Sequence, residues 1–297
     1  MGEGQLNYCA GIASALVRDG HKAIVAVTER WKGRLSAHGI QELVLPKGDD
    51  ESPQPDVKTI AKYMVKAGKI GPKSALDKAA MKGAGGTDRI DAVKRLDQQI
   101  AQLLPEIAPD VIVFDQFMSL PSVMRSGIPY VWACGNGTLT LVDDDRAPPP
   151  SSGLSAFGDK KLWKEFYEVK RNTTLEPWKQ FNAYVVSKGC QPLPKFHFIE
   201  TTDCLILYAF PLELDYLDIR PLPKNYIRFD NFMRKDIQLK FEIPVPLRDR
   251  PGKLVYFSLG SMGAADVDNM KRLVNILSKS KHRFIVSKGP LHDEYSL

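Results

Sequence analysis

The sequence predicts an α/β fold in which helices cover a parallel sheet, followed by the start of a second domain of the same type. Short apolar segments with the character of buried strands alternate with amphipathic segments along the chain. This alternation is typical of parallel sheets with helices on both faces. A proline-rich stretch then interrupts the pattern, and a new strand–turn–helix unit follows it. We therefore expect a first domain over residues 1–231, a linker over 232–252 and the beginning of a second domain over 253–297.

The first domain is expected to open with a helix whose apolar residues share one face and which ends at Gly20. Helical periodicity recurs in Thr59–Ala67 and Arg89–Leu104. Buried strands are predicted at Ile24–Val27, Asp110–Asp115, Ile128–Ala133 and Cys204–Tyr208. Residues 143–150 combine three aspartates with three prolines, which favours a surface loop. Because a doubly wound domain normally begins with a strand, we expect that the chain lacks its first strand.

The 45 residues from 253 to 297 repeat the α/β pattern once. They predict a strand, a Gly/Ser turn, a helix and a second strand at Leu254–Phe257, Ser258–Gly263, Asp266–Ser278 and Arg283–Ser287. So few residues cannot bury an α/β core of their own. The second domain is therefore expected to be incomplete.

The turn over Ser258–Gly263 is a candidate phosphate site. A strand that leads through a Gly/Ser turn into a helix offers free backbone N–H groups and the positive end of the helix dipole. A tight strand–helix turn can also require glycine for its backbone alone. The turn by itself therefore supports a functional and a purely structural interpretation equally.

Composition argues against several classes of function. The net charge is +6, but the basic residues are scattered and form no stripe with interleaved aromatics, so we expect no nucleic-acid partner. Four cysteines lie far apart without a CxxC or Cys/His cluster, which indicates neither a metal site nor a disulfide framework. The N-terminus lacks the apolar run of a signal peptide, and no stretch approaches 18 apolar residues. We therefore expect no membrane span and a cytoplasmic location for this chain.

Four segments, in this order, carry a resemblance to a known family. They are Gly4-Gln5-Leu6-Asn7, Val113-Phe114-Asp115-Gln116-Phe117, Gly127-Ile128-Pro129-Tyr130-Val131 and Gly252-Lys253-Leu254-Val255-Tyr256-Phe257-Ser258-Leu259-Gly260-Ser261-Met262. Their order and rough spacing resemble the UDP-glycosyltransferase superfamily, with macrolide-type and arthropod-like members most similar. The resemblance implies the GT-B fold, which consists of two Rossmann-like domains. It extends along nearly the whole chain, and the last segment is its most specific part.

The resemblance implies transfer of a hexosyl group from a UDP-sugar to a small lipophilic acceptor, with inversion and without a metal or other cofactor. In this family a histidine takes the acceptor proton and an aspartate orients that histidine. Asp115 matches the aspartate. The implied donor-binding residues are Gly260, Ser261 and Met262, and the implied acceptor-binding residues are Gln5, Phe117, Trp132 and Asn136. The family's later donor segment would follow Leu297, so we expect the chain alone to have little or no activity.

Gln5 stands where the family has its catalytic histidine. A glutamine amide has no useful basicity near neutral pH and cannot act as a general base. Three explanations remain open: a non-catalytic homologue that binds small lipophilic ligands, a proton transferred through Asp115 and a water, or a divergent start that makes the match meaningless. His21 is interpreted as structural, and His197, beside Pro194 and Phe196, as a packed loop histidine.

Overall fold

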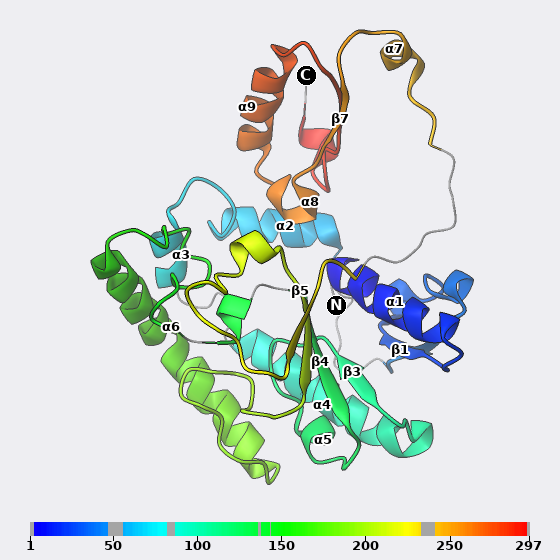
Figure 1. Ribbon diagram of the computed structural model, residues 1–297, viewed down its shortest axis with the longest axis vertical. Helices are drawn as coiled ribbons and strands as arrows, with labels where there is room; N and C mark the ends of the chain where they lie inside the picture. Colours follow the sequence, from blue (N-terminus) through cyan, green and yellow to red (C-terminus); the bar gives the residue numbers. More distant parts are fainter. Residues whose placement is uncertain are drawn as a thin grey trace. The chain divides into compact units, whose positions relative to one another are not determined.

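The computed structural model describes residues 3–46, 56–81, 87–135, 138–142, 144–232 and 241–295 (Figure 1). These residues form two compact units. The first combines the chain up to residue 46 with residues 79–232, and the second combines residues 56–78 with residues 241–295. Each unit is described separately below.

The first unit contains six of the described strands and four complete α-helices. Its strands are β1 (Ile24–Val27), β2 (Gln41–Val44), β3 (Ile112–Phe114), β4 (Tyr130–Cys134), β5 (Leu205–Ala209) and β6 (Tyr226–Phe229). Its helices are α1 (Glu3–Arg18), α4 (Thr87–Ile107), α5 (Pro121–Met124) and α6 (Lys160–Ser187), and α3 (Ala75–Ala80) straddles the boundary between the units. Short 3-10 helices are η1 (Glu29–Trp31), η2 (Ser36–His38), η3 (Thr138–Thr140) and η4 (Leu212–Leu214).

All strand pairs of the first unit are parallel, which confirms the predicted α/β class. One sheet has the order β3-β4-β5-β6, and β1 pairs with β2 in a second sheet. In the larger sheet Phe114 is in register with Trp132, and Trp132 with Ile206. Because the strands run in the same direction, their carboxyl ends lie at one edge of this sheet.

The core of the larger sheet lies between its strands and the helices α4, α5 and α6. Its buried members include Ile90, Phe114, Val123, Trp132, Phe181 and Ile206. The ring centroids of Phe114 and Trp132 are 4.1 Å apart. Burial of these large side chains stabilises the unit by roughly 1.5–3 kcal/mol each and holds the carboxyl edge of the sheet in place.

Helix α1 packs on the smaller sheet through Leu6, Ala10 and Ala13, which lie over Val27 of β1. These helical residues are spaced four and three positions apart and therefore share one face. The helix ends before Gly20, whose φ of +87° is left-handed, as the sequence predicts. The residues between these core positions, such as Gln5 and Tyr8, lie outside this core and can contribute to a functional site.

The chain between β4 and β5 differs from the prediction in two ways. Residues 147–150, predicted as part of a surface loop, have no regular structure but are buried. They are followed by α6, a helix of 28 residues that the sequence analysis does not predict. Asp159 caps this helix by accepting a hydrogen bond from the backbone N–H of Lys161 at 2.8 Å.

The second unit contains the parallel pair β7 (Leu254–Phe257) and β8 (Arg283–Val286). Its helices are α2 (Val57–Lys66), α7 (Val245–Arg248), α8 (Gly260–Gly263), α9 (Val267–Ser278) and the 3-10 helix η5 (His292–Glu294). Ala61 of α2 is buried with Ala265 and Leu291. The sequence analysis assigns residues 57–66 to the first domain, whereas the helix that they form packs here; the predicted linker limits stay a prediction.

Across the described parts of the chain, no helix is both long enough and apolar enough to cross a membrane.

Candidate functional site at the carboxyl edge of the larger sheet

Asp115 directly follows β3, at the edge of the sheet where open α/β folds bind their ligands. Gln5, in the first turns of α1, hydrogen-bonds to the Asp115 side chain. An amide N–H donates to a carboxylate, so the glutamine fixes the orientation of the acid. The structure thus brings together the two residues that the sequence analysis places at the family's catalytic positions.

Two further side chains of α1 reach the same edge. The Tyr8 hydroxyl donates a hydrogen bond to the Leu207 carbonyl at 3.5 Å, and the Tyr8 ring meets Phe232 edge-on, with centroids 4.5 Å apart. Gly135, just after β4, lies against this ring, because a Cβ atom there would be 3.7 Å from it. Leu207 within β5 and residues that follow β3, β4 and β6 therefore meet one helix face.

Burial is the main cause of the pKa shifts of the titratable side chains at this edge. It raises the pKa of Asp115 to about 6, and the hydrogen bond from Gln5 partly opposes that rise. Burial also raises the pKa of the Cys9 thiol to about 12, with the nearby Asp115 charge adding to the effect. The pKa of Tyr8 is raised still further, by burial first and then by Asp115. Of these three groups, only Asp115 exchanges a proton near neutral pH.

Tyr8, Cys9 and Phe232 are not among the site residues predicted from the sequence. Tyr8 and Cys9 follow Gln5 by three and four residues, and such residues are neighbours on one helix face. That spacing is a signal for both residues once Gln5 is singled out. Phe232 has no comparable signal, because its position depends on the packing of α1 against the sheet.

The predicted acceptor-binding residues have different surroundings. Phe117 is 42% exposed and stacks under the Arg89 guanidinium, 5.0 Å from the ring centroid. Trp132 is only 2% exposed and belongs to the core, so the expectation that it contacts an acceptor is not supported by its position. Asn136 lies outside the described residues.

The predicted donor turn lies in the second unit. Gly260 has a left-handed φ of +68°, and its N–H is 3.2 Å from the Ser258 hydroxyl oxygen, which accepts its hydrogen bond. Ser261 is exposed, whereas Met262 packs against Ala265 and its neighbours in the core. The expectation that Met262 faces a donor cleft is therefore not supported. The last four residues of the predicted turn, Gly260–Gly263, form a one-turn helix, α8, ahead of α9.

The described residues include no group of three or more His, Cys, Asp or Glu side chains that could hold a metal ion. None of the four cysteines, all of which lie in the described part of the chain, forms a disulfide.

Comparison with known proteins identifies the fold. No protein-family model matches the sequence, and no curated protein matches it significantly. Solved glycosyltransferase structures do match, over nearly the whole chain. The structure of CalG4, the calicheamicin glycosyltransferase, superposes with a TM-score of 0.54 and 14% identity, covering 97% of this chain and 62% of that one. The fold is thus that of the GT-B glycosyltransferases.

Two other structures give the same result. The kitacinnamycin glycosyltransferase matches with a TM-score of 0.56 and 12% identity, covering 97% of this chain and 63% of that one. SnogD from Streptomyces nogalater matches with a TM-score of 0.51 and 12% identity, covering 100% and 67%. The chain therefore spans about 62% of the length of CalG4. At such identities the likeness concerns the fold.

Proposed function

We propose that this chain belongs to a glycosyltransferase that moves a hexosyl group from a UDP-sugar to a small lipophilic acceptor with inversion. The observation that carries the proposal is the hydrogen-bonded pair of Gln5 and Asp115 at the carboxyl edge of the sheet. The GT-B fold supports it, and so do the sequence motifs at Asp115 and Gly260. The exposed Phe117 and the partly buried Tyr8 provide aromatic surface for a lipophilic acceptor.

In this proposal Asp115 is the general base. A carboxylate whose pKa lies near 6 is largely ionised at neutral pH and is still basic enough to take a hydroxyl proton as the transition state forms. The acceptor oxygen then bonds to the anomeric carbon while the bond from that carbon to the diphosphate breaks. The proton goes to Asp115, and the diphosphate leaves with the electron pair. Gln5 acts as a positioning residue that orients the carboxylate.

The donor side of the proposal uses Gly260 and Ser261. The left-handed Gly260 leaves open space where a side chain would stand, because a Cβ atom there would meet nothing within 4 Å. A phosphate can therefore approach the backbone closely. Met262 is left out of this site because it packs in the core of its unit.

The test is sugar transfer by the full-length gene product from UDP-glucose to a lipophilic alcohol such as geraniol, followed by mass spectrometry. We expect the rate to rise as the pH passes through about 6, and Asp115→Asn to lower it by at least ~100-fold. Asp110→Asn, at the other end of the same strand segment and exposed, is the matched control and should keep the wild-type rate. Transfer by Asp115→Asn at the wild-type rate would contradict the assignment.

A second candidate is a binding protein that holds a lipophilic ligand without chemistry. Gln5 favours a binding function, since an amide cannot take the proton from the hydroxyl group of the acceptor. The two candidates differ in the behaviour of Gln5→His. If the parent binds geraniol but transfers no sugar, and Gln5→His gains transfer while Gln5→Asn does not, the binding function is supported. Transfer by the parent excludes it.

A further inference from the structure

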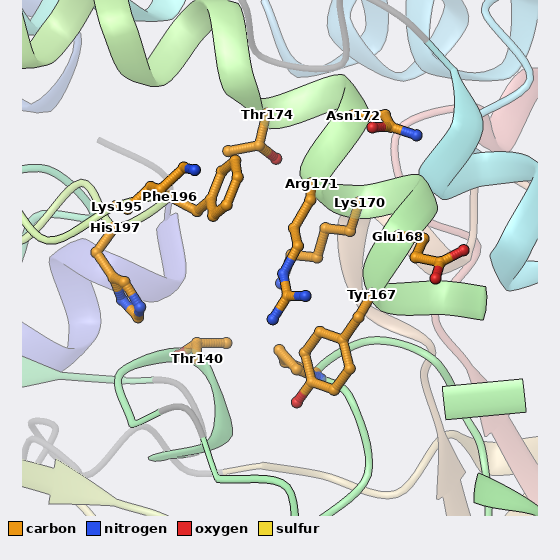
Figure 2. Close-up of a pocket in the computed structure, with 11 residues that line it drawn as sticks. Thr140, Tyr167, Glu168, Lys170, Arg171, Asn172, Thr174, Lys195, Phe196 and His197 are labelled. Carbon is orange, nitrogen blue, oxygen red and sulfur yellow. The ribbon is translucent and has the colours of Figure 1, made fainter. Parts of the chain in front are cut away.

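The first unit contains a cavity of about 640 Å³ that shares no lining residue with the Asp115 site. One wall is a face of α6, the opposite wall is the segment 195–197, and Thr140 and Pro150 complete the lining (Figure 2). The volume lies within the ordinary range for small-molecule sites. The cavity is open to solvent, so a ligand can reach it.

The helical wall presents cations and hydroxyl groups on a single face. Its members are spaced three, four and seven residues apart: Tyr167, Lys170, Arg171 and Thr174. Figure 2 shows the side chain of Arg171 extending into the open centre between Tyr167 and Thr140. Glu168, the only acidic lining residue among those described, points away from that centre in the same view.

The opposite wall is fastened to the same helix. Trp178 donates an indole hydrogen bond to the Pro194 carbonyl at 2.9 Å, and Asn182 accepts one from the backbone N–H of Leu193 at 2.7 Å. Phe196 has a left-handed φ of +68°, and its ring lies 6.3 Å from that of Trp178. A bulky residue keeps such a backbone only where surrounding contacts impose it. This wall is therefore a built structure that holds Phe196 in place.

A buried network supports the remaining side. Thr140 belongs to η3, and Thr138 at the start of η3 accepts a hydrogen bond from Arg220 and donates one to Asp215. Asp215 and Arg220 are fully buried, and the Tyr208 hydroxyl also donates to Asp215 at 2.7 Å. This buried network does not line the cavity, but it holds η3, which contributes Thr140 to the lining.

The cavity combines positive charge with aromatic surface. Among the described residues, neither Arg171 nor Lys195 forms an ion pair with a carboxylate. Instead, the Arg171 guanidinium lies 5.5 Å from the Tyr167 ring centroid, and the Lys195 ammonium 5.2 Å from that of Phe196. Guanidinium and ammonium groups bind carboxylates and phosphates strongly, and aromatic faces bind flat rings.

We propose that this cavity binds a flat organic anion, namely an aromatic ring that carries a carboxylate or a phosphate. The cations from the two walls would hold the charged group, with Tyr167 and Phe196 against the ring. This goes beyond the proposed glycosyltransferase function, and binding here does not require Asp115 or a sugar donor.

Calorimetric titration with 2-naphthyl phosphate, 2-naphthoate, 2-naphthol and inorganic phosphate tests the proposal. The two naphthyl anions should bind at least tenfold more tightly than 2-naphthol, because only they engage the cations. The two naphthyl anions should also bind more tightly than inorganic phosphate, which lacks the ring. The stronger of the two anions identifies the preferred charged group. Absence of binding by both anions at millimolar concentration would overturn the proposal.

Substitutions inside and outside the cavity test whether the naphthyl anions bind there. Arg171→Gln should weaken the naphthyl anions about tenfold, whereas Lys164→Gln, exposed on the same helix but outside the cavity, should change affinity less than twofold. Phe196→Gly keeps the left-handed backbone accessible and should weaken naphthyl phosphate but not inorganic phosphate. Equal affinities for wild type and Arg171→Gln would place the anion elsewhere and reject the cavity as its site.

Discussion

The edge of the larger sheet around Asp115 and the turn over residues 258–263 are both sites that the sequence predicts, yet they are built differently. The first is assembled from α1, Leu207 of β5 and residues that follow β3, β4 and β6. It holds a carboxyl group whose pKa burial raises to about 6. The second is a local turn in which one glycine adopts a left-handed backbone. The site at Asp115 depends on a buried titratable side chain, whereas the turn depends on backbone conformation alone. Substitutions should therefore affect them through different mechanisms.

The largest expected effect concerns the buried network of Thr138, Tyr208, Asp215 and Arg220 in the first unit. Asp215→Ala should lower the free energy of unfolding by about 3–5 kcal/mol, because it leaves the fully buried Arg220 without its carboxylate. Chemical denaturation monitored by circular dichroism measures the change. The double variant Asp215→Ala/Arg220→Met is the control and should recover much of the loss. If the single and double variants are equally unstable, the charge of Arg220 is not the cause.

The second unit should be most sensitive at the start of β7. Gly252 has a φ of +93°, and a Cβ atom there would lie 2.1 Å from the Lys281 carbonyl oxygen. We expect Gly252→Ala to cost about 2–4 kcal/mol, measured by thermal unfolding and by proteolysis of the C-terminal part. Gly20→Ala is the matched control: φ is +87° but nothing lies within 4 Å, so the cost should be about 1 kcal/mol. Equal costs would show that backbone conformation alone matters.

Asp115→Asn should stabilise the protein at neutral pH. The folded pKa of Asp115 lies above its ordinary value of 3.8, so ionisation opposes folding. The penalty is absent below pH 4, grows as the pH rises to about 6 and then stays constant. The variant should therefore be more stable than wild type by roughly 1–3 kcal/mol at pH 7.5, and equally stable at pH 3.5. Asp110→Asn should show no such gain; a loss of stability in Asp115→Asn would mean that the carboxylate is structural.

The smallest expected effect is at the donor turn. Gly260→Ala should cost about 1 kcal/mol, because φ is +68° but the space beside it is open. Ser261→Ala should leave the melting temperature unchanged, since this side chain is exposed. Differential scanning calorimetry of both variants measures the contrast. A cost above ~2 kcal/mol for Gly260→Ala would indicate packing around the turn rather than a purely conformational requirement.

The elements that the sequence predicts are those with a strong local signal. Strand β1 and the turn at Gly20 follow from a short apolar run and one glycine. Helix α6 escapes prediction because Pro177 interrupts its interior and one face carries Lys170 and Arg171 toward the cavity. Its core positions, such as Phe166 and Phe181, lie far apart in the sequence, and only tertiary packing brings them into register. Strands β2 (QELV) and β6 (YIRF) contain charged residues and lack the continuous apolar run that marks β1.

The same reasoning explains the candidate site. The position of Asp115 at a strand end follows from the sequence, because an apolar run ends there. The core position of Trp132 and the packing of Met262 depend on which helices cover the strands, and neither is visible in one sequence. The pKa of Asp115 likewise depends on burial under α1. The sequence predicts which residue can act as an acid or base, and the tertiary structure determines the pKa of that residue.

Whether Asp115 is a buried base held by Gln5 can be measured through the pKa of its carboxyl, by carbon-detected NMR in wild type and in Gln5→Leu. We expect a midpoint near pH 6 in wild type and a higher one in Gln5→Leu, because the amide hydrogen bond that favours the ionised form is lost. A wild-type midpoint near 4, unchanged in Gln5→Leu, would contradict a buried, amide-held base at this edge of the sheet.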